Sequence, residues 1–158
     1  MQKIGPCLWF DTQAEEAANF YVSVFSNSHI IETNYYLEGA PKPAGTVLTV
    51  RFSLNGEEFV ALNGGPEFTF SPAVSFVANC ADQAEVDHLW QGLLQDGGQE
   101  VQCGWLTDKY GVSWQVVPAE LYALLNSSDK AAAQRVMSAM LGMIKLDLPA
   151  LQKAFRAA

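Results

Sequence analysis

Residues 103–118, CGWLTDKYGVSWQVVP, combine a tight turn with the strand that follows it. Asp108 stands three residues before Gly111, and Asp at the first position with Gly at the fourth is typical of a type I turn. The run 112–117 then alternates, which predicts a strand with Val112, Trp114 and Val116 on one face and Ser113, Gln115 and Val117 on the other. Gln115 is thus a polar residue in an otherwise apolar strand, and its side chain either faces water or points into a cavity.

Composition and charge exclude several classes of protein. The 158 residues suit one domain with a sizeable core, and the net charge of −8 argues against nucleic-acid binding, which needs clustered Lys and Arg. No apolar run approaches the ~20 residues of a membrane span, and the N-terminus lacks the layout of a signal peptide. Cys7, Cys80 and Cys103 are odd in number and lack CxxC spacing, which indicates neither a disulfide framework nor a structural zinc site. We therefore expect a cytoplasmic protein that contacts neither nucleic acid nor membranes.

The order of predicted elements repeats along the chain. In the first half, Asp11 and Thr12 are candidate caps of a helix, and Asn55-Gly56 is a strong hairpin signal. In the second half, Asp82 is the candidate helix cap. The predicted strands cover residues 4–10, 29–36, 46–54, 59–63, 73–79, 100–106 and 112–117, and the alternative to a single strand at 100–106 is one strand within 98–103 and another at 105–107. Two βαβββ units, at about 1–66 and 72–118, therefore form an internal repeat.

The C-terminal segment 119–158 departs from this repeat and is predicted to be helical. Ser128 or Asp129 is the expected cap of its longest helix, and the last helix starts near Pro149. One face of the longest helix is apolar, which indicates a core or dimer contact, and it carries Val136, Met137, Met140, Leu141 and Ile144.

The repeat and several short stretches resemble a known superfamily. These stretches are WF at 9–10, EEAANFY at 15–21, ALNGGP at 61–66, SFVANC at 75–80, the sequence 103–118 quoted above, and VMSAMLGMIKLDLPAL at 136–151. They resemble the PhnB-like branch, often labelled 3-demethylubiquinone-9 3-methyltransferase-like, of the vicinal-oxygen-chelate superfamily of glyoxalase, bleomycin-resistance and dioxygenase proteins. The resemblance implies a single α+β domain over 1–158, in which two βαβββ units form curved mixed sheets around a cavity, and it implies a homodimer.

Metal-binding members of that superfamily place four ligands on the first and last strands of the two units. Carried over by resemblance, these positions fall near Ile4 or Pro6, at Asn63, near Ala73 or Ser75, and at Gln115. Transition metals prefer imidazole, thiolate or carboxylate, and neutral amides are weak ligands. The histidines, His29 and His88, lie elsewhere in the sequence. We therefore predict no metal and no cofactor.

The methyltransferase label has little support in the sequence. Methyl transfer from S-adenosylmethionine usually uses a doubly wound fold with a glycine-rich turn after the first strand, and here Phe10 is followed by Asp11-Thr12-Gln13. Asn63-Gly64-Gly65-Pro66 follows a strand but opens no helix. The cysteines lack a histidine base placed by the sequence, so buried structural thiols are the expectation.

Three functional hypotheses remain. The first is a metal-free small-molecule-binding protein for an aromatic or hydrophobic ligand, in which Asn63 and Gln115 orient the ligand and Arg51, Trp105 and Trp114 line its cavity. The second is a metal-dependent lyase, isomerase or dioxygenase, and the third is a dimer whose own side chains fill the cavity. A cross-strand pair with Glu58 is the alternative for Arg51, and core packing is the alternative for both tryptophans.

Overall fold

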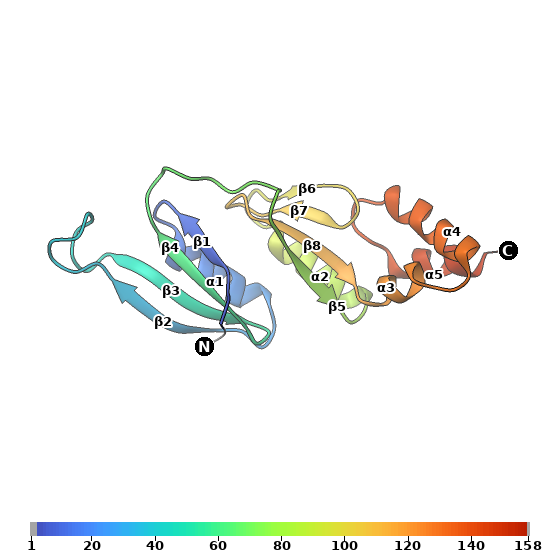
Figure 1. Cartoon of the computed structure of the whole chain (residues 1–158), viewed down its shortest axis with the longest axis horizontal. Coiled ribbons are helices and arrows are strands. Elements are labelled where there is room, and N and C mark those ends of the chain that lie inside the picture. The colour runs from blue at the N-terminus through green and yellow to red at the C-terminus, as the bar shows by residue number, and fades with distance from the viewer. Residues whose placement is uncertain (1–2, 158) are drawn as a thin grey trace. The chain divides into compact units, whose positions relative to one another are not determined.

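The computed structural model describes residues 3–157 and has the α+β architecture that the sequence predicts (Figure 1). The chain forms two compact units, Met1–Phe70 and Ser71–Ala158. Each unit contains a four-stranded sheet and a helix that follows the first strand of the sheet. The repeated βαβββ order is therefore confirmed, while the assignment of both units to one domain stays a prediction.

The first unit is a mixed sheet with one helix packed on it. Its elements are β1 (Cys7–Phe10), α1 (Ala14–Val24), β2 (His29–Tyr35), β3 (Val47–Leu54) and β4 (Glu57–Asn63). The strand order is β1-β4-β3-β2, with β1 parallel to β4 and the other pairs antiparallel. Aromatic rings join α1 to the sheet, since the centroid of Tyr21 lies 6.1 Å from that of Phe52, which lies 5.4 Å from Phe59. The core of this unit therefore lies between α1 and one face of its sheet.

The hairpin between β3 and β4 forms at the predicted dipeptide. Asn55 and Gly56 have φ angles of 49° and 93°. Two-residue hairpin turns of type I′ require positive φ at both positions, which Asn tolerates and Gly adopts without strain. Leu54 and Glu57 on either side of the turn are direct cross-strand partners. The turn thus sets the register of the two strands.

The start of α1 is capped from a distance, so the prediction of Asp11 or Thr12 as its cap was wrong. The N-cap residue is Gln13, and Asn63 at the end of β4 supplies the cap. The Asn63 Oδ1 atom accepts a hydrogen bond of 2.8 Å from the Ala14 amide, and its Nδ2 atom donates one of 3.1 Å to the Val47 carbonyl. Local cap signals do not predict this arrangement, because the acceptor for the backbone N–H at the helix start is a buried side-chain amide 49 residues away.

The second unit repeats this arrangement and adds three helices. Its elements are β5 (Ser75–Cys80), α2 (Gln83–Leu93), β6 (Gln99–Glu100), β7 (Trp105–Thr107), β8 (Ser113–Pro118), α3 (Glu120–Leu125), α4 (Lys130–Leu141) and α5 (Leu148–Arg156). The strand order is β5-β8-β7-β6, and β5 is parallel to β8. Asp82 caps α2 as predicted, because its side chain accepts a 2.9 Å hydrogen bond from the Glu85 amide.

The turn before β8 is closed by a buried carboxylate. The Gly111 amide donates to the Asp108 carbonyl at 2.9 Å, which confirms the predicted turn. Asp108 is only 3% exposed. Its Oδ1 atom accepts hydrogen bonds from the Tyr110 amide at 2.9 Å and from the Val112 amide at 3.0 Å. Its Oδ2 atom accepts from Trp114 Nε1 at 2.9 Å. The turn and the strand are therefore held together by one side chain.

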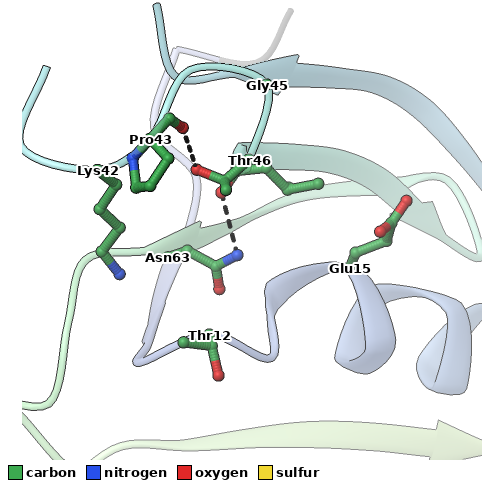
Figure 2. Close-up of a pocket in the computed structure, with 8 residues that line it drawn as sticks. Thr12, Glu15, Lys42, Pro43, Gly45, Thr46 and Asn63 are labelled. Carbon is green, nitrogen blue, oxygen red and sulfur yellow. Dashed lines mark hydrogen bonds between the residues drawn. The ribbon is translucent and has the colours of Figure 1, made fainter. Parts of the chain in front are cut away.

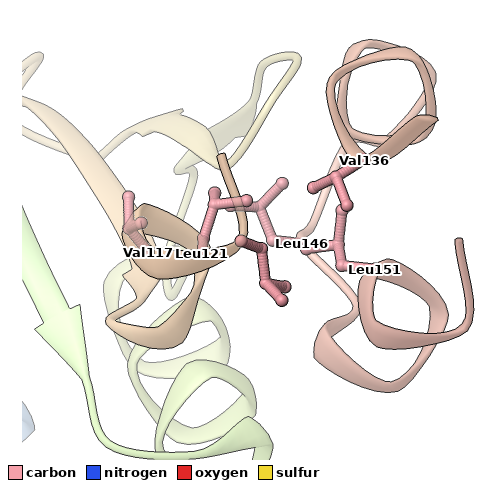
Figure 3. Close-up of a cluster of buried hydrophobic side chains, with 6 residues drawn as sticks. Val117, Leu121, Val136, Leu146 and Leu151 are labelled. Carbon is pink, nitrogen blue, oxygen red and sulfur yellow. The ribbon is translucent and has the colours of Figure 1, made fainter. Parts of the chain in front are cut away.

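The C-terminal helices have a core of their own within the second unit (Figure 3). That core consists of Val117, Leu121, Leu124, Val136, Leu146 and Leu151. Asp129 and Asp147 cap α4 and α5. On the predicted apolar face of α4, Val136 is buried, whereas Met137 and Leu141 are exposed. Over residues 3–157, every helix falls short of the length and apolarity needed to cross a membrane.

An ion pair connects these helices to α2 and makes their attachment dependent on pH. Lys145 contacts the carboxylate of Asp87, and Gln83 donates to the same carboxylate at 3.1 Å. The hydrogen bond from Lys145, followed by that from Gln83, lowers the pKa of Asp87. The stabilisation is present above the ordinary pKa of aspartate and is lost as the pH falls through the lowered pKa.

We therefore expect Asp87→Asn to lower the melting temperature at neutral pH and to have progressively less effect in acid. Thermal unfolding of both forms between neutral pH and pH ~3 measures this difference. Glu38→Gln, which changes an exposed carboxylate in the other unit, is the control for general effects of charge. A constant difference between the wild-type and Asp87→Asn proteins at every pH would contradict the assignment.

Candidate functional site

Each sheet has a helix-covered face and a second face, called here the open face. In the first unit, Val50, Phe52 and Ala61 are buried under α1, whereas Arg51, Val60 and Leu62, which alternate with them, are only partly buried. The open face of the first sheet is formed by Trp9, Arg51, Glu58, Val60 and Leu62, and that of the second sheet by Val77, Trp105, Thr107 and Gln115. Partly buried side chains on an uncovered sheet face are candidates for contacting a ligand.

Hydrogen bonds show which open-face positions are equivalent in the two units. The Gly64 amide donates to the Phe10 carbonyl at 2.9 Å, and the Ala119 amide donates to the Cys80 carbonyl at 2.8 Å. Strand β4 therefore ends at Asn63 in the same way that β8 ends at Pro118. Val60 lies three residues before Asn63, and Gln115 lies three residues before Pro118, so the register makes Val60 the counterpart of Gln115. The neighbours across the sheet are then also equivalent.

These neighbours define a row on each open face. The first row contains Glu32, Arg51, Val60 and Cys7. The second row contains Val101, Trp105, Gln115 and Val77. The resemblance made Asn63 and Gln115 the equivalent last-strand positions of the two units. The register instead makes Val60 the residue equivalent to Gln115. Arg51 and Trp105, predicted on other grounds, are equivalent to each other.

The second row carries an oriented amide among apolar side chains. Gln115 Nε2 donates to Ser75 Oγ at 3.0 Å, and Trp105 is the direct cross-strand partner of Gln115. Val77 and Val101 flank this pair and are 45% and 48% exposed. Among the described residues, the Gln115 carbonyl oxygen and the indole nitrogen of Trp105 have no hydrogen-bond partner, so both are available to a ligand. The sequence comparison named Ser75 as a possible first-strand position but did not predict its hydrogen bond to Gln115.

The first row is charged and internally paired. Arg51 Nη1 lies 2.9 Å from Glu32 Oε2, and Arg51 Nη2 lies 3.2 Å from Glu58 Oε2. The expected cross-strand pair with Glu58 is therefore confirmed, and Glu32 joins it. The hydrogen bonds that Arg51 donates to Glu58 and then to Glu32 raise the pKa of Arg51, so it stays protonated. Glu58 lies two residues before Val60 on the same open face, so one cation with two carboxylates gives this part of the face a negative charge.

The other two predicted site residues lie on helix-covered faces. Trp114 is 2% exposed, packs against Phe76 in a tilted arrangement with ring centroids 5.4 Å apart, and donates to Asp108. Asn63 is 7% exposed and makes the two hydrogen bonds that hold the start of α1 and the Val47 carbonyl. Both side chains therefore have structural partners, and Asn63 also lines the pocket described next.

A pocket of about 600 Å³ lies in the first unit at the start of α1 (Figure 2). It is lined by Thr12, Glu15, Lys42, Pro43, Gly45, Thr46, Val47 and Asn63. These residues come from the start of α1, the loop before β3 and the end of β4. Sequence reasoning identified only Asn63, because nothing in the spacing of Lys42 and Glu15 shows that the loop folds over the helix start.

The donor set of the open faces does not fit the metal site of the superfamily. The paired first- and last-strand positions of the two rows are Cys7 with Val60 and Val77 with Gln115. Only Cys7 has a side chain that binds transition metals strongly. Within either unit, the described residues contain no group of three His, Cys, Asp or Glu side chains able to hold a metal ion.

The cysteines do not form a nucleophilic centre. Cys80 is buried, and desolvation raises its pKa to about 12, so its thiol stays protonated at neutral pH. This confirms the expectation of a buried structural thiol for Cys80. Desolvation also raises the pKa of Cys7, although this residue is exposed.

Trp9 explains the glycine pair that follows β4. Its Nε1 atom donates to the Gly65 carbonyl at 2.9 Å, and its ring meets Phe68 edge-on at 5.0 Å between centroids. A Cβ atom on Gly64 would lie 2.2 Å from Trp9 Cζ2. The indole therefore lies directly over the Gly64 backbone.

We expect Gly64→Ala to destabilise the protein by about 1–3 kcal/mol, since a rigid ring must move to admit the methyl group. Urea unfolding followed by circular dichroism measures the change. Gly142→Ala is the matched control, because a Cβ atom there meets only Ala139 O at an ordinary 3.5 Å. Equal stabilities for the two variants would show that Trp9 does not restrict Gly64.

Comparisons with known proteins agree with this geometry. The family model described as 3-demethylubiquinone-9 3-methyltransferase matches residues 2–117. A PhnB protein from Bacillus cereus bearing that family name is 41% identical, with a TM-score of 0.68 over 75% of this chain and 100% of its own. A Pseudomonas aeruginosa protein is 21% identical and shares the fold, with a TM-score of 0.61 over 75% of this chain and 98% of its own. A glyoxylase/bleomycin resistance protein/dioxygenase domain from Frankia sp. is 11% identical, with a TM-score of 0.46 over 75% of this chain and 95% of its own. No curated protein matches the chain.

Two βαβββ units, each with a mixed sheet and a helix that follows its first strand, place the protein in the α+β class. The chain belongs to the PhnB-like family described as 3-demethylubiquinone-9 3-methyltransferase. The matched residues end at 117, so the helices α3 to α5 lie beyond the part of the chain that defines the family.

Proposed function

We propose that this protein binds an uncharged aromatic or quinol-like molecule, without a metal, on the open face of its second sheet. The observation that carries the proposal is the pair of Gln115 and Trp105, in which Ser75 orients the amide and the indole lies on the adjacent strand. An aromatic ring can pack on Trp105 and on the exposed Val77 and Val101. Its oxygen atoms can then bond to the amide of Gln115.

The contrast between the two rows supports an uncharged ligand. The second row has no ionisable side chain, whereas the first row has Arg51 held between Glu32 and Glu58. An anionic ligand would find no cation in the second row to pair with, and Arg51 of the first row is already paired with two carboxylates. In this proposal Arg51 therefore contributes to the shape of its sheet face, and Gln115 selects the ligand.

The name of the family points to methyl transfer, and we do not extend that activity to this chain. Each sheet here joins one parallel strand pair to two antiparallel pairs. Methyl transfer from S-adenosylmethionine usually uses a doubly wound parallel sheet with a glycine-rich turn after its first strand. The quinone part of the name remains useful, because it suggests oxygen-bearing aromatic rings as probes.

We further propose that the protein acts as a homodimer, as the resemblance to its superfamily implies. The exposed apolar side chains of Met137 and Leu141 on α4, outside the proposed ligand site, support a partner that covers them. Size-exclusion chromatography with light scattering measures the mass in solution. A monomer at all concentrations would refute this part of the proposal.

The binding proposal is tested with a panel of methoxyphenols and short-chain quinols. We expect a subset to raise the melting temperature of EDTA-treated protein, because a ligand that binds only the native state stabilises it. Gln115→Leu and Trp105→Ala should each weaken binding by about tenfold, corresponding to ~1.4 kcal/mol. Isothermal titration calorimetry gives the dissociation constants.

Matched controls separate loss of contact from loss of fold. Tyr122→Ala removes an aromatic ring that is 48% exposed on α3 and should leave binding unchanged. Gln95→Leu removes an exposed amide outside the open face and should behave likewise. The proposal fails if no probe binds, if Gln115→Leu and Trp105→Ala bind as well as the wild type, or if binding appears only after a metal is added.

A further inference from the structure

The pocket at the start of α1 lies apart from the open face of the same sheet. Asn63, which lines it, is on the α1-covered face, whereas Arg51 and Val60 belong to the open face. The aromatic-binding proposal does not use this pocket. Its volume of about 600 Å³ is within the range of small-molecule sites, so its chemistry is considered separately.

The walls of the pocket are fixed by hydrogen bonds between its three segments. Asn63 bonds to the Ala14 amide of α1 and to the Val47 carbonyl at the start of β3. Tyr36 donates its hydroxyl to the Asn63 carbonyl at 2.7 Å. Lys42 Nζ donates to the Asp11 carbonyl at 3.0 Å and brings the loop to the helix start. The pocket is therefore preformed, which lowers the entropy cost of binding.

Opposite charges stand on two sides of this pocket. Figure 2 shows Lys42 and Glu15 at opposite sides, with the side chain of Asn63 between them. Within residues 3–157, neither the Lys42 ammonium nor the Glu15 carboxylate forms an ion pair. An uncharged occupant would cover both charges without compensation, and a simple anion or cation would meet one charge of its own sign.

We propose that this pocket binds a small zwitterion that carries a primary ammonium and a carboxylate, such as a short peptide or an ω-amino acid. The carboxylate of the ligand faces Lys42, and its ammonium faces Glu15. The Asn63 amide keeps one N–H and one acceptor position beyond its two internal bonds, and these serve the middle of the ligand. The hydroxyls of Thr12 and Thr46 add polar contacts at the rim.

The test uses two zwitterions, L-alanyl-L-alanine and γ-aminobutyrate, as nuclear magnetic resonance probes of ¹⁵N-labelled full-length protein. We expect saturable shifts of the Thr12, Glu15, Gly45 and Thr46 amides with at least one of them. Acetylation of the ligand amine or amidation of its carboxylate should weaken binding by about tenfold, or ~1.4 kcal/mol. Absence of these shifts with both zwitterions, or equal binding of the capped ligands, would overturn the proposal.

Variants of the two charged residues provide an independent arm. Lys42→Met and Glu15→Gln should each weaken binding by about tenfold, whereas Lys130→Met and Glu57→Gln, which change exposed charges elsewhere, should not. Because Lys42→Met also removes the bond to Asp11, thermal unfolding monitors the fold of each variant. The exchange variant Glu15→Lys with Lys42→Glu should bind better than either of its single changes. Failure of that rescue in a folded variant would contradict the assigned roles.

Discussion

Asp108→Ala is expected to destabilise the protein by about 3 kcal/mol or more, the largest effect of any single substitution considered. The carboxylate accepts hydrogen bonds from the Tyr110 and Val112 amides and from Trp114 Nε1. Its removal leaves these donors without their acceptor in a site that is 3% exposed. Each buried donor that loses its partner costs about 1–3 kcal/mol. Chemical denaturation followed by tryptophan fluorescence measures the loss.

A conservative variant separates the contributions within this group. Asp108→Asn keeps an oxygen for the backbone amides but turns an N–H₂ group toward the Trp114 indole N–H, so we expect about half of the alanine effect. Asp96→Ala is the matched control, since Asp96 pairs with Lys109 at a site where its side chain is 74% exposed. That pair should contribute less than about 1 kcal/mol. Similar losses for the Asp96 and Asp108 variants would refute the structural role of Asp108.

Gly104→Ala is the substitution with the second large expected effect, a loss of about 2–5 kcal/mol in the free energy of unfolding. Gly104 has a φ of +82°, where an L side chain costs ~1–2 kcal/mol. A Cβ atom there would lie 2.9 Å from Leu146 Cδ1 and 2.9 Å from the Val116 carbonyl oxygen, which adds about 1–3 kcal/mol of overpacking. Leu146 belongs to the core of the C-terminal helices, so the damage should centre there.

The matched control for this variant is Gly39→Ala. Gly39 has nearly the same φ, +83°, but nothing lies within 4 Å of the position its Cβ atom would take. It therefore measures the backbone cost alone, and the difference between the two variants measures the packing against Leu146. Hydrogen exchange should show faster opening of α5 in Gly104→Ala only. Equal stabilities would mean that the C-terminal helices do not pack tightly on β8.

Much of the fold can be predicted from the sequence because its signals are local. The Asn55-Gly56 turn, the Asp82 cap and the alternation of β8 each depend on neighbouring residues, and the structure contains all three. The cap of α1 could not be predicted this way, because the Asn63 amide comes from 49 residues further along the chain. Sequence spacing measures distance along the chain and not through space.

The candidate site shows the same division. Alternation in β8 placed Gln115 opposite to Trp114, and the structure confirms that separation, with Trp114 on the buried side. Which face of the strand is covered depends on the helix that packs there. The spacing of Gln115 and Trp114 therefore could not show which of the two side chains is buried and which is available to a ligand. The equivalence of Val60 and Gln115 follows from interstrand register, which a single sequence does not specify.

The most direct test of the proposed function is the indole N–H spectrum of EDTA-treated, ¹⁵N-labelled protein during titration with the quinol that corresponds to the ubiquinone ring. The chain has four tryptophans, at positions 9, 90, 105 and 114, so the spectrum carries its own controls. We predict a saturable shift of Trp105, together with the side-chain amide of Gln115, while the buried Trp90 and Trp114 stay unchanged. A titration that leaves Trp105 unmoved, or moves it only after a metal is restored, would contradict metal-free binding on the open face of the second sheet.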